Sequence, residues 1–212
     1  MVTATVNVAK GCVYHASWTP PDLWSPDSAV SNEDYDGMRL VSNTGRPLRG
    51  QPKLASRGSG KLDVFVAAAP RIGDYFLEVL HSTWDGQTWS AFKNISSFGH
   101  DQLFQSFNVA QTGSSTSQVQ LVAYNASAYM SRTTYSGSDW SGWQTVPDDE
   151  EEGGFITSNE PLAVSTGKGT DYFGLRYNGT IARKSWDGSK YNPPGTAWDH
   201  INGTSEDGFM AM

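Results

Sequence analysis

Aromatic and basic side chains recur together at fixed spacing along the chain. One aromatic column steps twice by 51 residues, from Trp84 to Tyr135 to Trp186, and Trp18 precedes it. A basic residue stands three positions before each member. An aromatic ring offers a flat apolar face and a basic side chain donates hydrogen bonds, so each set could hold a ligand that has one apolar face and a polar rim. The four basic residues are His15, His81, Arg132 and Arg183.

A second aromatic column follows the first and has the same period. It consists of Trp24, Trp89, Trp140 and Tyr191, and its last three members are again 51 residues apart. Trp24, Trp89 and Trp140 stand just after turns that contain Gly or Pro, so we predict that they lie at blade edges and face a ligand. Tyr191 takes the same position in the last repeat and joins the predicted site residues.

Structural roles are the alternative for several of these side chains. Trp84 and Trp186 end runs of apolar or β-branched residues, so we predict that both serve the core. For His15 and His81, a hydrogen-bonded structural histidine is as consistent with the sequence as a ligand contact.

The spacing defines an internal repeat of the kind that propeller blades have. The predicted repeats cover about 1–50, 51–103, 104–157 and 158–204 of a single domain, 1–212. Trp18 precedes Trp84 by 66 residues, so about fifteen extra residues fall between Trp24 and Gln51. This stretch is polar and rich in turn residues, and we predict an inserted loop.

Each repeat is predicted to form four antiparallel strands in up-and-down order, because short β-branched and aromatic runs alternate with turn residues. Asp85-Gly86 and Asn178-Gly179 are typical of tight hairpins. The expected fold is all-β, a β-propeller with about four blades per chain. The last residues, 205–212, resemble the opening strand of a repeat, so the N- and C-terminal strands are predicted to share one blade. A piece of a larger propeller, or two chains that pool their blades, remain open alternatives.

Composition argues against several functional classes. The net charge is −7 and the sequence has no cluster of Lys and Arg, so we expect no nucleic-acid partner. No apolar stretch reaches 18 residues, so we expect no membrane insertion. The only cysteine, Cys12, excludes an intramolecular disulfide and is predicted to be a small buried side chain. We expect no cofactor.

The acidic run DDEEE at 148–152 is predicted to be a solvated loop. Calcium binding there, or near Asp34 and Asp36, is a minor alternative, and no metal site is predicted. The chain opens without a signal-peptide pattern, whereas four Asn-x-Ser/Thr sequons favour secretion, so the sequence leaves the location open.

Two strings resemble the blade repeats of the β-propeller lectins: GSGKLDVFV at 58–66 and LHSTWDGQTWSAF at 80–92. Weaker echoes occur at 166–177 and 181–191. This group includes the Photorhabdus-type lectins and the fucose-binding lectins related to the Aleuria lectin. The resemblance implies a multivalent lectin that binds glycans, of fucose type or another, at shallow aromatic-lined sites between blades. A pyranose, with its apolar face and its hydroxyl rim, suits the aromatic and basic columns.

The sequence departs from the fucose lectins in one respect. There the column of His81 and Arg183 resembles the position of an acidic sugar contact, paired with an arginine about twelve residues earlier. Here Asp171 precedes Arg183 by twelve residues, and Asp63 takes the matching position before His81. A structural Asp–Arg bridge between strands is therefore an alternative to a sugar contact.

An enzyme is not expected. Propeller glycosidases carry Asp boxes, and the nearest matches, at 82–89 and 136–143, lack their order. Glu78 and Glu160 are isolated acids in ordered segments, but nothing pairs them for hydrolysis. A protein-interaction propeller and, less favoured, a glycosidase are the alternatives to a lectin. The expected partners are glycans on glycoproteins or cell surfaces, and a homo-oligomer is left open.

Overall fold

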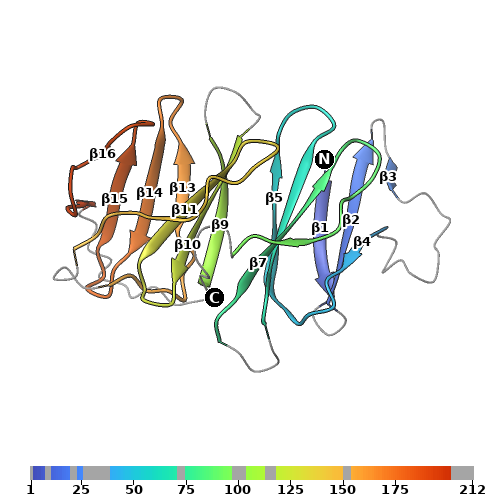
Figure 1. Ribbon diagram of the computed structural model, residues 1–212, viewed down its shortest axis with the longest axis horizontal. Coiled ribbons are helices and arrows are strands. Elements are labelled where there is room, and N and C mark those ends of the chain that lie inside the picture. The colour runs from blue at the N-terminus through green and yellow to red at the C-terminus, as the bar shows by residue number, and fades with distance from the viewer. Residues whose placement is uncertain are drawn as a thin grey trace. The chain divides into compact units, whose positions relative to one another are not determined.

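The computed structural model describes residues 2–7, 11–19, 23–25, 39–70, 75–96, 104–112, 118–149 and 154–201. Within these ranges every helix or strand assigned is a β-strand, which confirms the all-β prediction (Figure 1). The strands form four antiparallel sheets, as the repeats predict. They belong to two compact units, the first with strands β1 to β8 and the second with strands β9 to β17. The described residues contain no helix with the length and apolar character needed to span a membrane.

The first unit contains two sheets. One sheet has the order β1-β2-β3, with β4 also paired to β2, and the other has the order β5-β6-β7-β8. The strands are β1 (Val2–Asn7), β2 (Cys12–Thr19), β3 (Leu23–Ser25), β4 (Arg39–Asn43), β5 (Leu48–Ser56), β6 (Leu62–Ala68), β7 (Glu78–Trp84) and β8 (Lys93–Asn94).

The predicted loop between Trp24 and Gln51 is wrong in part. Strand β4 lies inside it and pairs with the Cys12–His15 part of β2, whereas β3 pairs with the other end of β2. Strand β5 also begins at Leu48, before Gln51. The cause is the free edge of β2: the short β3 leaves part of it unpaired, and the Arg-Leu-Val-Ser-Asn run of β4 has the β-branched and apolar character to complete the pairing.

The second unit also contains two sheets. One has the order β9-β10-β11-β12, and the other has the order β13-β14-β15-β16 with β17 also paired to β15. The strands are β9 (Phe104–Thr112), β10 (Gln118–Asn125), β11 (Met130–Tyr135), β12 (Gln144–Thr145), β13 (Leu162–Ser165), β14 (Thr170–Leu175), β15 (Ile181–Trp186), β16 (Tyr191–Asn192) and β17 (Asp199–Ile201).

The two aromatic columns face each other across the outer edge of every sheet. Trp18 pairs with Trp24 and Trp186 with Tyr191 in regular ladders, whereas Trp84–Trp89 and Tyr135–Trp140 form isolated bridges. The ring centroids are 5.5 Å apart for Trp84–Trp89, 4.9 Å for Tyr135–Trp140 and 4.6 Å for Trp186–Tyr191. The sequence period therefore marks one repeated structural element, an aromatic pair at the hairpin that closes each blade.

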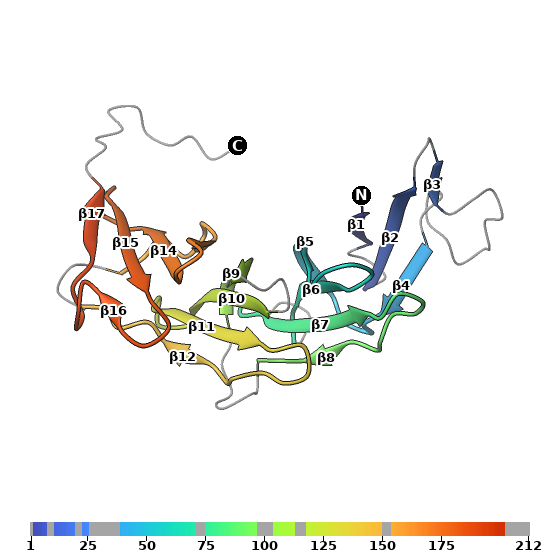
Figure 2. The same ribbon diagram turned by 90° about the horizontal axis from the view of Figure 1, so that it is seen from above.

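Within each unit, neighbouring sheets meet through their first strands. Strand β1 contacts β5 in the first unit, and β9 contacts β13 in the second. From there the strands of each sheet follow one another outward in chain order, as Figure 2 shows for β5 to β8 and for β9 to β12. This is the arrangement of propeller blades. The predicted closing strand, 205–212, lies outside the described residues, so the shared blade remains a prediction.

Each unit has an apolar core between its two sheets. Both cores draw side chains from both sheets, as blade packing requires. The core of the first unit comprises Val13, Leu48, Val64, Val66, Ala68 and Leu80. The core of the second comprises Ala110, Val122, Tyr124, Met130, Val146, Phe155, Ala163, Tyr172, Ala182 and Trp198. Cys12 is buried in β2, as predicted.

The acidic run contributes to the second core. Asp148 is not solvated as predicted: its side chain is 2% exposed and lies 2.6 Å from the guanidinium of the fully buried Arg176. That guanidinium also lies over the ring of Phe155, 4.7 Å from its centroid. A buried arginine needs a carboxylate nearby, and Asp148 provides it.

Candidate functional site

The basic column occupies equivalent positions in three blades. His81 faces Phe65 across the ladder, Arg132 faces Val122, and Arg183 faces Phe173. Two residues before each of these partners, on the same face of the strand, stand Asp63, Gln120 and Asp171. The column therefore pairs a basic residue with an acid in two blades and with an amide in the third.

In the β5–β8 blade the basic residue belongs to a buried ion cluster. Asp63 is fully buried and accepts hydrogen bonds from Arg57 at 2.5 Å and from the Nε2 of His81 at 2.8 Å. The His81 ring stacks on Phe65 with a centroid distance of 4.6 Å. Burial lowers the pKa of His81 below 6.5, although the hydrogen bond and charge of Asp63 raise it in part. His81 is thus a structural histidine, the alternative that the sequence left open.

In the β13–β17 blade the basic residue forms an ion pair with its own neighbours. Arg183 donates through Nε and Nη2 to Oδ2 of Asp171 at 3.0 and 2.8 Å. Asp199 of β17 lies 3.6 Å from its Nη1. The strand-to-strand Asp171–Arg183 bridge that the sequence offered as an alternative is therefore present, and it neutralises this arginine.

Arg132 of β11 differs from both. It is 9% exposed, and its Nε donates to the hydroxyl of Tyr191 in the neighbouring blade at 2.8 Å. Its guanidinium carbon lies over the ring of Trp186, 4.4 Å from the centroid. Among the residues that the structure describes, no carboxylate lies within ion-pair distance of Arg132, because Gln120 takes the position that Asp63 and Asp171 hold in the other blades.

Arg132 lines a cleft of about 400 Å³ between the two blades of the second unit. One wall comes from β10 and β11, and the other from the turn before β14 and from the end of β15. Both walls combine polar side chains with exposed backbone, and Trp186 supplies an aromatic surface. The lining residues are Gln118, Gln120, Arg132, Thr134, Gly167, Lys168, Gly169, Thr170, Trp186, Asp187 and Gly188.

Gln120 places a buried amide in this cleft. It is 3% exposed and donates to the hydroxyl of Thr134 at 3.3 Å, whereas its buried Oε1 accepts no hydrogen bond of good geometry. The phenol of Tyr172 lies close by. Burial raises the pKa of Tyr172, so this phenol stays protonated, although the charge of Arg132 acts in the opposite direction. The amide oxygen itself is closed to solvent and lies beside this phenol. The exposed Gln118 and the half-buried Thr134 also line the cleft, and they are acceptors that a ligand hydroxyl could reach.

Two turns shape the far wall. Gly169 lies so close to the strand end that a Cβ there would collide with the backbone carbonyl of Trp186, so only glycine allows this approach. In the second turn, Asp187 Oδ1 accepts hydrogen bonds from the backbone N–H groups of Ser189 and Lys190, both at 2.8 Å. These bonds, that of Lys190 first, lower the pKa of Asp187. Its carboxylate therefore serves mainly its own turn.

The structure brings together two of the predicted site residues, Arg132 and Tyr191. Trp186, predicted to serve the core, both packs against the core of the second unit and lines the cleft, so that prediction is wrong in part. Sequence reasoning missed Gln120 and the 167–170 turn. The spacing held a signal for Gln120, which precedes Asp171 by 51 residues, the repeat period.

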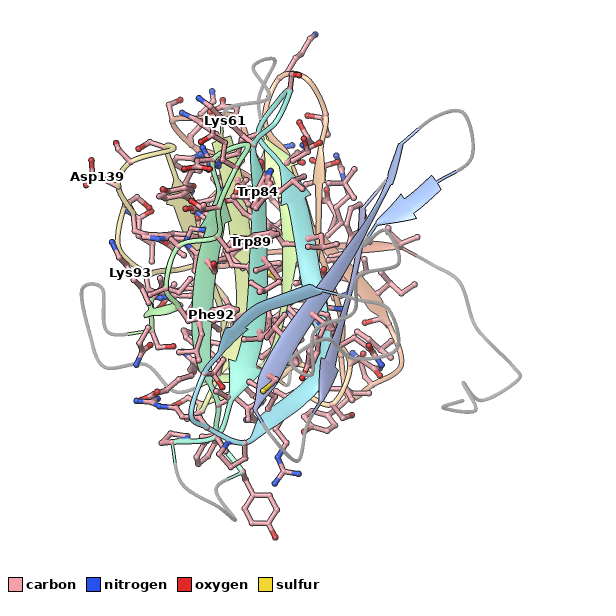
Figure 3. The ribbon with its side chains drawn as sticks, turned by 90° about the vertical axis from the view of Figure 1, so that its right-hand side faces the viewer. Lys61, Trp84, Trp89, Phe92, Lys93 and Asp139 are labelled. Atoms are coloured by element: carbon pink, nitrogen blue, oxygen red, sulfur yellow. The ribbon has the colours of Figure 1, made fainter. Side chains whose placement is uncertain are left out.

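The other predicted residues lie elsewhere. Trp89 is half-buried and packs against the core of the first unit, as Phe92 does, and its ligand-facing role stays a prediction. Figure 3 shows Trp84, Trp89 and Phe92 following one another down the β5–β8 sheet. Trp140 is half-buried against Tyr135 and does not line the cleft.

Two further predicted residues, His15 and Trp24, lie in described strands, but their side chains fall outside the described part of the structure. His81 and Arg183 belong to the ion pairs given above.

The acids considered for hydrolysis belong to different units. Glu78 of β7 forms an ion pair with Arg46 in the first unit, and Glu160 is exposed in the second. Within the described ranges, no three His, Cys, Asp or Glu side chains are grouped so that they could hold a metal ion.

Solved structures share this architecture. The fucose-specific lectin from Aleuria aurantia matches 94% of this chain with a TM-score of 0.57 at 12% identity. The BP39L lectin from Burkholderia pseudomallei matches 93% with a TM-score of 0.54 at 15% identity. The chain spans about half the length of these proteins, 55% and 53%.

The crystal structure of another Aleuria aurantia lectin form is described as a six-bladed β-propeller, and it matches 91% of this chain and 52% of its own, with a TM-score of 0.54 at 12% identity. No family model matches the chain, and no curated protein sequence matches it. The likeness confirms, at the level of the fold, the resemblance read from the blade strings. The chain has the β-propeller fold of these lectins.

Proposed function

We propose that the protein is a lectin that binds a sugar in the cleft between the β9–β12 and β13–β17 blades. The observation that carries the proposal is the meeting of Arg132, Gln120 and Trp186 in this cleft. A pyranose needs an aromatic surface for its C–H face and paired donors and acceptors for its hydroxyls. Trp186 supplies the surface, the guanidinium supplies donors, and the side chains of Gln118 and Thr134 supply acceptors.

The fold supports this proposal by analogy. The Aleuria aurantia lectin is described as fucose-specific, and a mutant of it was solved with α-methyl-L-fucoside. Function resides in the site and not in the fold, so the analogy extends to sugar binding as a class. Fucose is the first neutral sugar to test.

The energetics favour weak binding at each site and strong binding to clustered glycans. One stacked ring and a few hydrogen bonds correspond to a dissociation constant in the range of roughly micromolar to millimolar. We propose that a homo-oligomer presents several copies of this cleft. Several such sites would raise the apparent affinity for a glycan-coated surface about a hundredfold or more.

A glycan array with the purified protein tests the proposal, followed by titration of tryptophan fluorescence with the best free sugar. We expect saturable binding that weakens about tenfold in Trp186→Ala, because the aromatic wall is lost. Trp84→Ala is the matched control: Trp84 holds the same column position in the first unit and does not line the cleft, so it should bind as the wild type does.

A second variant, Tyr191→Phe, removes the hydroxyl that orients Arg132 and should weaken binding by a smaller factor. Circular dichroism checks that each variant is folded. A blank array with a folded, β-rich protein would contradict the proposal and favour a protein-interaction propeller. Equal binding by Trp186→Ala and the wild type would place the sugar outside this cleft.

A further inference from the structure

The cleft holds a cation whose charge no described carboxylate neutralises. At the equivalent positions of two other blades, Asp171 neutralises Arg183, and the neutral His81 lies against Asp63, which pairs with Arg57. Arg132 is more buried than Arg183, which is 35% exposed, yet the neighbours that the structure describes for its guanidinium are the phenols of Tyr191 and Tyr172 and the ring of Trp186. Burying a charge is costly unless an opposite charge lies near, so this position is suited to an anion brought by the ligand.

The arrangement of Arg132 fits a carboxylate better than a hydroxyl. Its Nε donates to Tyr191, and its guanidinium carbon lies 4.4 Å from the centroid of the Trp186 ring, so the group is held at the wall of the cleft. A planar guanidinium binds a carboxylate through charge-assisted hydrogen bonds that are roughly twice as strong as those between neutral groups. Lys168, exposed on the turn that forms the opposite wall, adds a second positive charge.

The remaining groups of the cleft call for a hydroxylated ligand. Gln118 and Thr134 line it and offer acceptors, which a carboxylate cannot satisfy but a sugar hydroxyl can. Asp187, the one acid in the lining, keeps its charge, but Arg132 and Lys168 together leave the lining with a net positive charge. A ligand that contacts both Arg132 and these acceptors would therefore carry a carboxylate and hydroxyl groups on one small framework.

We infer that this cleft selects acidic sugars, pyranoses that bear a carboxylate, over their neutral counterparts. The inference rests on the proposed function and specifies the ligand class of the same site. Arg132 binds the carboxylate, Gln118 or Thr134 accepts a hydrogen bond from a ring hydroxyl, and Trp186 covers the apolar face.

The test compares matched sugars by titration of tryptophan fluorescence or by calorimetry. The pairs are D-galacturonic acid with D-galactose, and D-glucuronic acid with D-glucose; N-acetylneuraminic acid with its methyl ester separates a sialic acid from a uronic acid. We expect the acid of at least one pair to bind about tenfold tighter than its neutral partner. The preference should decrease as salt rises, because the interaction is ionic.

Variants locate the preference. Arg132→Gln should abolish it, whereas Lys61→Gln, an exposed position outside the cleft that loses the same unit of charge, should retain it (Figure 3). Gln120→Glu keeps the size of the side chain and supplies Arg132 with an internal carboxylate. It should abolish the preference while neutral sugars still bind, which keeps the test decisive if Arg132→Gln fails to fold.

The outcomes separate the two proposals. Neutral sugars that bind in the cleft as tightly as the acids would overturn the acidic preference and leave the lectin standing. A preference that survives in both Arg132→Gln and Gln120→Glu would place the carboxylate elsewhere and also overturn the inference. No binding of any sugar would remove the proposed function, and the inference with it.

Discussion

In the β5–β8 blade the basic residue of the third strand lies against a carboxylate, and in the β9–β12 blade its counterpart lies against an amide. Asp63 holds His81 and Arg57 in a buried cluster. Gln120 cannot neutralise Arg132, whose guanidinium instead reaches Tyr191 and Trp186 of the next blade and lines a cleft. One position thus distinguishes the structural ion cluster from the candidate binding site. It lies two residues before the strand partner of the basic side chain and holds Asp63 in one blade and Gln120 in the other.

The largest expected effect is on the buried ion cluster around Asp63. Asp63→Asn removes the carboxylate from between Arg57 and His81 and leaves a buried arginine without its partner. Breaking such a pair should lower the free energy of unfolding by about 3–5 kcal/mol. Urea denaturation followed by circular dichroism measures it. A loss below about 1 kcal/mol would mean that solvent already reaches this cluster.

The next largest effect is expected when Arg132 gains a carboxylate partner within its own blade. Gln120→Asp reproduces the residue that the other two blades have, and its carboxylate should pair with Arg132 as Asp171 pairs with Arg183. We expect a loss of acidic-sugar binding of about tenfold, equivalent to about 1.4 kcal/mol, without a loss of stability. Calorimetric titration with D-galacturonic acid checks the first part and urea denaturation the second. Unchanged binding would show that the carboxylate at this position does not reach Arg132.

The pH dependence of stability distinguishes the β5–β8 blade from the β9–β12 blade, because the basic residue is a histidine, His81, in the first and an arginine, Arg132, in the second. Burial, the main cause, lowers the pKa of His81 below 6.5, so the folded chain keeps it neutral where the unfolded chain binds a proton. Stability should therefore rise with pH through this window and fall as the pH drops below about 6.5.

Urea midpoints at about pH 7.5 and about pH 5.5 measure this slope. His81→Gln should have a shallower slope than the wild type, whereas Arg132→Gln should keep the wild-type slope. Identical slopes for His81→Gln and the wild type would assign the pH dependence to other groups.

The smallest effect is expected at Arg183. Its ion pair with Asp171 resembles that of the buried cluster, but the side chain is 35% exposed, so solvent screens the charges. Arg183→Gln should cost no more than about 1 kcal/mol of unfolding free energy. The same urea experiment provides the comparison with Asp63→Asn. A cost as large as that of Asp63→Asn would mean that exposure does not separate the two pairs.

Local sequence patterns predicted the blades well. Short β-branched runs that alternate with turn residues predicted the antiparallel sheets, and Asp85-Gly86 and Asn178-Gly179 marked two of the turns, because these signals act within a few residues. Gly86 and Gly179 do have positive φ, 108° and 82°. Strand β4 was missed because its pairing depends on an edge left free by β3, which is a property of the assembled sheet.

The candidate site was predicted only in part, since it forms between blades. The sequence identified Arg132 and Tyr191 and offered the Asp171–Arg183 bridge as an alternative. It could not predict the contact between Trp186 and Arg132, because that contact joins residues of neighbouring blades. Gln120 was overlooked because it stands where the other two blades have an aspartate, so it looks like a position that has lost its charged group. Its role became visible only when the structure placed it near Arg132, which has no described carboxylate within ion-pair distance.

The central claim, that the cleft between the blades of the second unit binds a sugar, is tested most directly by nuclear magnetic resonance. Indole N–H signals would be followed during titration with fucose and with D-galacturonic acid, and Trp186→Phe identifies the signal of Trp186. The account predicts that this signal shifts saturably, together with the Nε–H of Arg132, while the Trp84 signal stays in place. A shift confined to other tryptophans, with Trp186 unmoved at saturation, would contradict it.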